Sequence, residues 1–201
     1  VDGIGTVSGA PDMAVVQFGV QREARDAASA MAAASAAMAD VLATLKGAGI
    51  APEDIQTTRV GLDPRWRHAQ DGSPPRVTGY IASNTLSVSV RDMDALGPVL
   101  DAVVSDGANM MHGLSFQIAD ASDMEDLARQ LAVRDAARKA SILAKAGGAQ
   151  LGPVISISEG STGGAPIARF ETALADRGAV PIAGGSVDVV VQVRAVFELT
   201  E

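Results

Sequence analysis

The sequence is poor in the side chains that most enzymes use for chemistry at neutral pH. Its 201 residues include no cysteine, two histidines, one tryptophan and one tyrosine. The absence of cysteine excludes disulfide frameworks, thiol catalysis and cysteine-based zinc sites, and the shortage of histidine leaves few candidates for a general base. We therefore expect a protein that is not an enzyme, with no catalytic, cofactor-binding or metal-binding residues and no cofactor.

Basic side chains are also scarce. Sixteen lysines and arginines stand against 24 acidic residues, which gives a net charge of -8. The densest basic stretch is Arg65, Arg67 and Arg76, in a proline-rich segment that is predicted to form a loop. An acidic chain of this kind repels a phosphate backbone, so no nucleic-acid partner is expected.

Long apolar runs are missing as well. The longest valine-rich run, from Val187 to Val196, is interrupted by Asp188, Gln192 and Arg194, so the sequence predicts no transmembrane segment. The chain also begins in a strand-like stretch, Val1 to Val7, without an initiator methionine or a basic leader. This start suggests that a leader was removed, either by processing in the cell or because the sequence was chosen to begin after the leader.

What the chain does contain is an ordinary globular composition, with 47% hydrophobic and 20% charged residues, so we expect a single domain over residues 1–201.

Helical spacing predicts helices at 26–46, 94–104 and 122–146, the last with a capping box of Ser122 and Glu125, while residues 167–175 could form a short helix. Apolar alternation predicts strands at 1–7, 13–21, 55–62, 77–90, 114–118, 154–158 and 187–199, the first two pairing with each other. Hairpins dominate this order, which predicts an α+β fold: an antiparallel or mixed β-sheet packed on one side by long α-helices. A strand-helix-strand-strand order occurs at 13–90 and again at 112–199, which suggests an internal duplication.

Three groups of residues have the chemistry of a site, and each also has a structural explanation. Gly3, Gly5 and Gly9 lie in extended sequence that leads into another strand and not into a helix, which favours strand bends or close backbone packing over a phosphate loop. His68 near Asp63 and Asp71 lacks the ligand spacing of a zinc site, so an exposed loop histidine is favoured. His112, beside two methionines, is interpreted as a packed or rim residue.

Two polar clusters also have structural explanations. The acids Asp120, Asp123, Glu125 and Asp126 surround a predicted helix start, where negative charge is favoured, and they lack the ligand rhythm of a calcium loop. The serines of the late strand region have neither a nucleophile elbow nor an identifiable base; they are Ser156, Ser158 and Ser161.

Two features favour an interaction surface. Trp66 is the only tryptophan and lies in a polar segment, where an aromatic residue is typical of either an interface anchor or a cap over a sheet edge. Residues 160–185 are rich in Gly, Ala and Pro and place apolar side chains in a segment with little polar cover; these are Ile167, Phe170, Leu174, Val180 and Ile182. This segment is either an oligomer contact or a lid over the domain's own core. We expect Trp66→Ala or removal of residues 165–180 to change oligomer size, and a loss of fold would assign both to the core.

The order of several segments resembles the SIMPL-domain family. The segments are Gly3-Ile-Gly-Thr-Val-Ser-Gly-Ala-Pro-Asp-Met-Ala14 through Val20; Gly49-Ile-Ala-Pro-Glu-Asp-Ile-Gln-Thr57; Gly79-Tyr80 with Asn84 and Leu86 to Arg91; Asp106-Gly-Ala-Asn109; Ala132-Val-Arg-Asp-Ala136 with Lys139-Ala140; and Pro181-Ile182 followed by Val187 to Leu199. Together they span nearly the whole chain, and none is a catalytic signature. The chain departs from the family around Trp66, where the family more often has a tyrosine near a proline, and in its glycine-rich segment.

This resemblance implies a bacterial protein exported with a cleaved signal peptide, periplasmic or peripherally associated with the outer membrane, in a family that includes immunogens. It also implies an α+β fold, ring-like or channel-like homo-oligomers in some members, and a loosely defined link to oxidative-stress tolerance. Two hypotheses follow. The first is a non-enzymatic periplasmic protein that acts by self-association. The alternative is a periplasmic small-ligand-binding domain, with or without weak enzymatic activity, whose pocket between helices and sheet includes Asn84, Asn109 and His112.

Overall fold

The computed structural model describes residues 1–67, 74–160, 167–169 and 183–201. These residues form two compact units. Unit 1 contains the described residues of 1–11 and 116–201, and unit 2 contains those of 12–115. Both combine an antiparallel sheet with helices, so the α+β prediction is confirmed, although the strands form two sheets instead of one.

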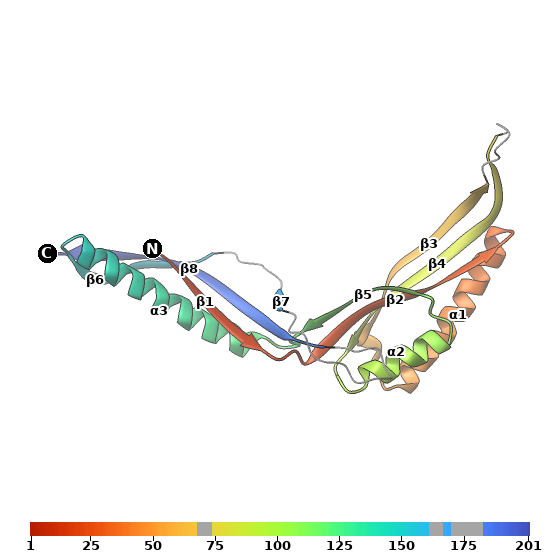
Figure 1. Ribbon diagram of the computed structural model, residues 1–201, viewed down its shortest axis with the longest axis horizontal. Coiled ribbons are helices and arrows are strands. Elements are labelled where there is room, and N and C mark those ends of the chain that lie inside the picture. Colours follow the sequence, from red (N-terminus) through yellow and green to blue (C-terminus); the bar gives the residue numbers. More distant parts are fainter. Residues whose placement is uncertain (68–73, 161–166, 170–182) are drawn as a thin grey trace. The chain divides into compact units, whose positions relative to one another are not determined.

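Unit 1 is a sheet with one long helix on it. Strand β8 (Ser186–Thr200) pairs with β1 (Asp2–Gly9) on one side and with β6 (Gln150–Glu159) and the short β7 (Ile167–Arg169) on the other, always antiparallel. Helix α3 (Ser122–Ala146) lies along β1 and β8 (Figure 1). Alternate valines of β8 face this helix because side chains of a strand point to opposite faces in turn.

Alanines and glycines bring α3 unusually close to the sheet. The helix buries an alanine at every fourth position, which aligns them on one face; they are Ala128, Ala132, Ala136, Ala140 and Ala144. Opposite them, a Cβ on Gly3 would lie 2.1 Å from the carbonyl oxygen of Ala132, and one on Gly5 would lie 1.9 Å from that of Ala128. Close backbone packing is confirmed for Gly3 and Gly5, whereas a Cβ on Gly9 would meet the side chain of Met124 at 3.0 Å.

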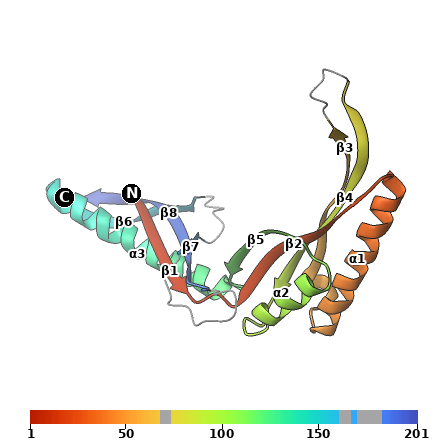
Figure 2. The same cartoon turned by 45° about the vertical axis from the view of Figure 1, so that its right-hand side comes forward.

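Unit 2 is a four-stranded sheet in the order β3-β4-β2-β5. Its strands are β2 (Met13–Ala24), β3 (Ile55–Arg67), β4 (Arg76–Val90) and β5 (Met110–Gln117), the last ending in unit 1. Helix α1 (Ala27–Gly47) packs on β2 and β4, and helix α2 (Leu96–Ser105) lies beside α1 (Figure 2). A short 3₁₀ turn, η1 (Pro52–Asp54), precedes β3.

The helices of unit 2 cover one face of its sheet. Asp26 caps α1 by accepting a hydrogen bond from the Ser29 amide at 2.8 Å. Below the helix, Val16, Phe18 and Val20 of β2 are fully buried beside apolar residues of β4. By length and composition alone α1 could also cross a membrane, and a third of that window is buried inside unit 2.

Four local predictions are corrected by the structure. The first two strands do not pair with each other, because β1 joins β8 and β2 joins β4, each under a different helix. The capping box is wrong: Ser122 is already in the helix and its amide donates to Asp120 Oδ1 at 3.0 Å, while Glu125 pairs with Arg129. Residues 167–169 form a strand instead of a helix, and the rest of 170–175 lies outside the described residues. The proposed duplication is not confirmed, because β5, the first strand of the predicted second repeat, belongs to the sheet of the first repeat.

Candidate interaction surfaces

The end of the β3–β4 hairpin carries the one tryptophan. Pairing between β2 and β4 stops at Ala24 and Tyr80, so β3 and β4 continue beyond β2 as a two-stranded ribbon. We call residues 64–67 and 74–77, at the end of this ribbon, the hairpin tip. Trp66 belongs to β3 and not to the loop predicted for it, and 54% of its surface is exposed.

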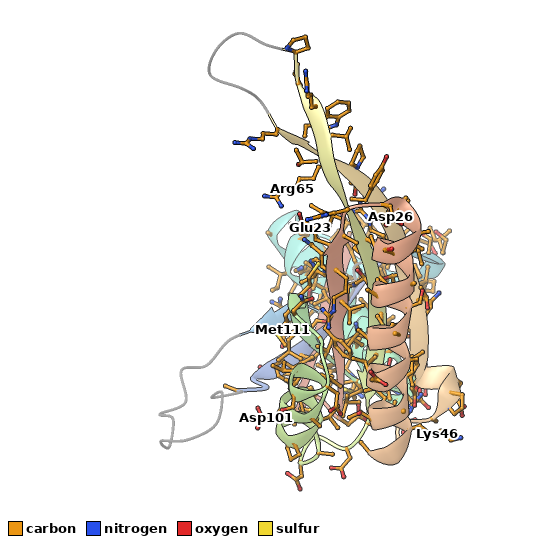
Figure 3. All side chains as sticks on the ribbon, turned by 90° about the vertical axis from the view of Figure 1, so that its right-hand side faces the viewer. Glu23, Asp26, Lys46, Arg65, Asp101 and Met111 are labelled. Carbon is orange, nitrogen blue, oxygen red and sulfur yellow. The ribbon has the colours of Figure 1, made fainter. Side chains whose placement is uncertain are left out.

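Side chains of the hairpin tip are apolar on one face and basic on the other. Trp66 lies opposite Val77, and Arg67 lies opposite Arg76. Like charges directly opposite each other in a sheet are destabilising, and among the described residues no ion pair is recorded for either arginine. Arg65, by contrast, is bonded to Glu23 of β2 (Figure 3).

A second feature of unit 2 is an apolar groove between α2 and β5, which we call the α2–β5 groove. Its volume is about 240 Å³ and its lining residues are Phe18, Val103, Val104, Ala108, Asn109, Met110 and Met111. Phe18 and Val103 form the buried floor, whereas Val104 and Met111 are 57% and 55% exposed. Exposed methionine is typical of adaptable binding surfaces because its thioether is flexible and polarisable.

Hydrogen bonds to β2 fix the turn between α2 and β5, next to this groove. Gly107 has a φ of 112°, which only glycine adopts without strain. Its carbonyl accepts a hydrogen bond from Arg22 Nη2 at 3.1 Å. Asn109 binds the backbone of Gln21 twice, accepting from its amide at 2.8 Å and donating to its carbonyl at 3.0 Å. These bonds give a structural reason for the Asp106-Gly-Ala-Asn109 segment.

The segment that forms the wall of the groove has acidic and no basic side chains of its own, although Arg22 of β2 reaches Gly107 beside it. Residues 92–115, which include all of α2, contain four aspartates and neither lysine nor arginine. Asp101 lies one helical turn before Val104, so the two share a face of α2, and Asp106 bonds to Thr44 of α1. Figure 3 shows Asp101 and Met111 on the same side of unit 2.

Three of the edge strands, β3, β6 and β1, carry features that hinder pairing with another strand. Edge strand β3 has two register shifts and carries Pro64, and edge strand β6 has two register shifts and carries Pro153. At the edge of β1, the Ile4 amide donates to Asp135 Oδ2 at 3.1 Å. The remaining edge strand, β5, contributes to the wall of the α2–β5 groove.

Unit 1 has an apolar groove of its own, between the end of α3 and the sheet. Its volume is about 300 Å³, and its lining residues are Val1, Ala140, Leu143, Ala144, Leu151, Ala195, Val196, Phe197 and Leu199. Leu143, Val196 and Leu199 are exposed. No charged residue lines it, so its chemistry suits an apolar group.

Shifted pKa values mark surface ion pairs and turns, not a cleft. Lys139, Arg138 and the Ile4 amide hold the pKa of Asp135 well below its usual range. Arg91 lowers the pKa of Asp54 through a hydrogen-bonded ion pair at 2.8 Å, and carboxylates on three sides raise the pKa of Arg129. Among the described residues no three His, Asp or Glu side chains are placed to hold a metal ion.

The residues that the sequence singled out do not converge on one pocket. His112 is exposed on β5, and Asn84 lies on β4, where its Oδ1 is buried without a hydrogen-bond partner among the described residues. Of the three pocket candidates only Asn109 lines the α2–β5 groove. Ser156 and Ser158 are exposed on β6, whereas His68, Asp71 and Ser161 lie outside the described residues, as do Phe170, Leu174, Val180 and Ile182.

This geometry defines an α+β protein of two units whose distinctive surfaces are an aromatic hairpin tip and two apolar grooves. The chain belongs to the SIMPL family, described as a protein of unknown function (DUF541), whose profile matches residues 1–197. It is 38% identical to the 26 kDa periplasmic immunogenic protein of Brucella melitensis, over 99% of this chain and 83% of that protein. It is 34% and 32% identical to the uncharacterised protein YggE of Edwardsiella ictaluri and of Escherichia coli K12, over 77% of this chain and 64% and 62% of those proteins.

Proposed function

We propose that this protein is a non-enzymatic periplasmic protein that acts by self-association. The observation that carries the proposal is the hairpin tip, where Trp66 and Val77 stand exposed beyond the end of β2. Exposed aromatic and apolar side chains on a protruding element are typical anchors of protein interfaces. The name of the Brucella relative supports the periplasmic location.

The absence of a catalytic constellation on the described surfaces supports the non-enzymatic part. A general base or nucleophile needs a positioned partner in a site that excludes water. Here the shifted carboxylates are bound by arginines, lysines or backbone amides at the surface, which serves stability.

Light scattering of the purified protein tests self-association. At tens of micromolar we expect a mass at least twice the 20.4 kDa of the chain. Trp66→Ala should lower that mass and leave the circular dichroism spectrum unchanged, because the side chain contributes little to the core. A strict monomer at these concentrations contradicts the proposal.

The groove of unit 1 favours a second candidate, the binding of a small apolar ligand. Its volume suits a short acyl or aromatic group. A melting-temperature screen against such compounds should then give a rise that Leu143→Glu, at the groove wall, abolishes. A rise retained in the variant would place the ligand elsewhere.

The link to oxidative-stress tolerance and the outer-membrane association stay proposals that rest on the family resemblance. If assembly is the function, a strain lacking the protein should regain peroxide survival with the intact chain and not with an assembly-deficient variant. Equal rescue by both would separate stress tolerance from assembly.

A further inference from the structure

We propose that copies of this protein contact each other head to tail, with the hairpin tip of one copy seated in the α2–β5 groove of the next. The inference rests on the proposed self-association and names its interface. Both surfaces belong to unit 2 and consist of described residues.

Among the described residues, Arg67 and Arg76 of the hairpin tip have no acidic partner. The hairpin tip carries three arginines and no acid, although the whole chain has a net charge of -8. Arg67 and Arg76 face each other across the two strands, and an acidic surface placed against them would relieve their repulsion. Trp66 and Val77 form an exposed apolar pair next to them.

The α2–β5 groove offers the matching chemistry. Its exposed walls are Val104 and Met111, and methionine sulfur makes favourable contacts with aromatic rings. Asp101 stands one turn from Val104, in a segment of four aspartates without a basic residue. An aromatic side chain with arginines next to it therefore meets an apolar groove that has the carboxylate of Asp101 on the same helix face as Val104.

The hairpin tip cannot reach the groove of its own chain. Phe18 in the groove floor pairs with Leu86, which is ten residues along β4 from Arg76, a distance of about 33 Å at roughly 3.3 Å per residue. Figure 3 shows the hairpin end and Asp101 at opposite ends of unit 2. The contact therefore joins two copies, and because it uses two different surfaces it repeats, closing into a ring or extending as a filament.

Charge-swapped variants test the contact. The tip variant is Arg67→Asp with Arg76→Asp, and the groove variant is Asp101→Lys. Each places like charges across the contact, so each alone should weaken association by about tenfold or more. Mixed in equal amounts they should recover the wild-type mass by sedimentation, because each tip then meets an oppositely charged groove. Arg134→Asp with Lys145→Asp on α3 is the matched control, and it should keep the wild-type mass.

Trp66 supplies a second readout that does not depend on variants. As the only tryptophan it should show a blue-shifted emission as protein concentration and mass rise together, because the ring leaves water. Wild-type assembly with unchanged Trp66 emission overturns the inference, and so does a tip variant that keeps the wild-type mass or a mixture of two dissociated variants that stays dissociated. A wild-type chain that is monomeric throughout contradicts the proposed function itself.

Discussion

Two glycines set the distance between β1 and α3 at the scale of single residues. A methyl group on Gly5 would lie 1.9 Å from the carbonyl oxygen of Ala128 and 2.6 Å from the Ala132 amide nitrogen. Both are backbone atoms, so no side chain can rotate away. We expect Gly5→Ala to lower the free energy of unfolding by about 3 kcal/mol in chemical denaturation, the upper end for overpacking.

Gly113→Ala is the matched control for this change. Gly113 also lies in a strand, but nothing stands within 4 Å of the position of its missing Cβ. Its substitution should change stability by less than about 0.5 kcal/mol, as is usual at exposed sites. Equal stability of both variants would mean that β1 can shift away from α3 at little cost.

Asn84 is the second residue with a measurable consequence. Its Oδ1 is buried without a partner among the described residues, and it faces Val20 and Val60 on the neighbouring strands. Asn84→Val removes the buried polar group and suits a strand, so the free energy of unfolding should rise by about 1 kcal/mol. Thermal and urea unfolding measure this change. A loss of stability would show that the amide is bonded in solution.

At the scale of elements, the sequence predicted which segments are helices and strands but not how strands pair. Residues 26–46 and 122–146 show helical spacing, and α1 and α3 follow it closely. Pairing depends on contacts between segments far apart in the chain, such as Val1 and Ala195, and local periodicity carries no information about them. The stripe of alanines in α3 was a missed signal, because small residues at every fourth position indicate close approach to another backbone.

Asp135 ties two elements of unit 1 together. Its carboxylate binds Lys139 at 2.6 Å and the Ile4 amide at 3.1 Å, so it links α3 to β1. These partners lower its pKa in the folded state. A lowered folded pKa stabilises the fold above the unfolded value of about 3.9, and the stabilisation is lost as the pH falls below it.

Asp135→Asn should therefore lower the melting temperature at pH 7. The difference from the wild-type chain should stay constant between about pH 5 and 7. It should shrink as the pH falls below about 4, because the carboxyl of the unfolded chain then takes up a proton while the folded one, with its lowered pKa, is still ionised. Asp123→Asn, an exposed acid in the first turn of the same helix, serves as the control. A difference that grew in acid would contradict the assigned direction of the pKa shift.

At the scale of the whole molecule, composition predicts interaction over catalysis, and the Trp66 that the sequence singled out is exposed at the hairpin tip. The α2–β5 groove could not be found in the same way, because its wall comes from a helix, a strand and a turn brought together by Arg22 and Asn109. The one sign of the groove in the sequence was the segment 92–115, which has four aspartates and neither lysine nor arginine. Only the fold shows that these charges lie far from the arginines of the hairpin tip.

Salt should separate the charged and apolar parts of the head-to-tail contact. The Debye length falls from about 30 Å at 0.01 M to about 3 Å at 1 M salt. Added sodium chloride therefore screens the attraction of Arg67 and Arg76 for Asp101. We expect the mass measured by light scattering to fall over this range. In Trp66→Ala the fall should begin at lower salt, because the charges act there without the apolar anchor. The tip variant with both arginines reversed should instead gain mass with salt, since screening then weakens a repulsion. A wild-type mass that stays constant or rises with salt would show that apolar contact alone holds the copies together, since salts strengthen such burial when they act on it at all.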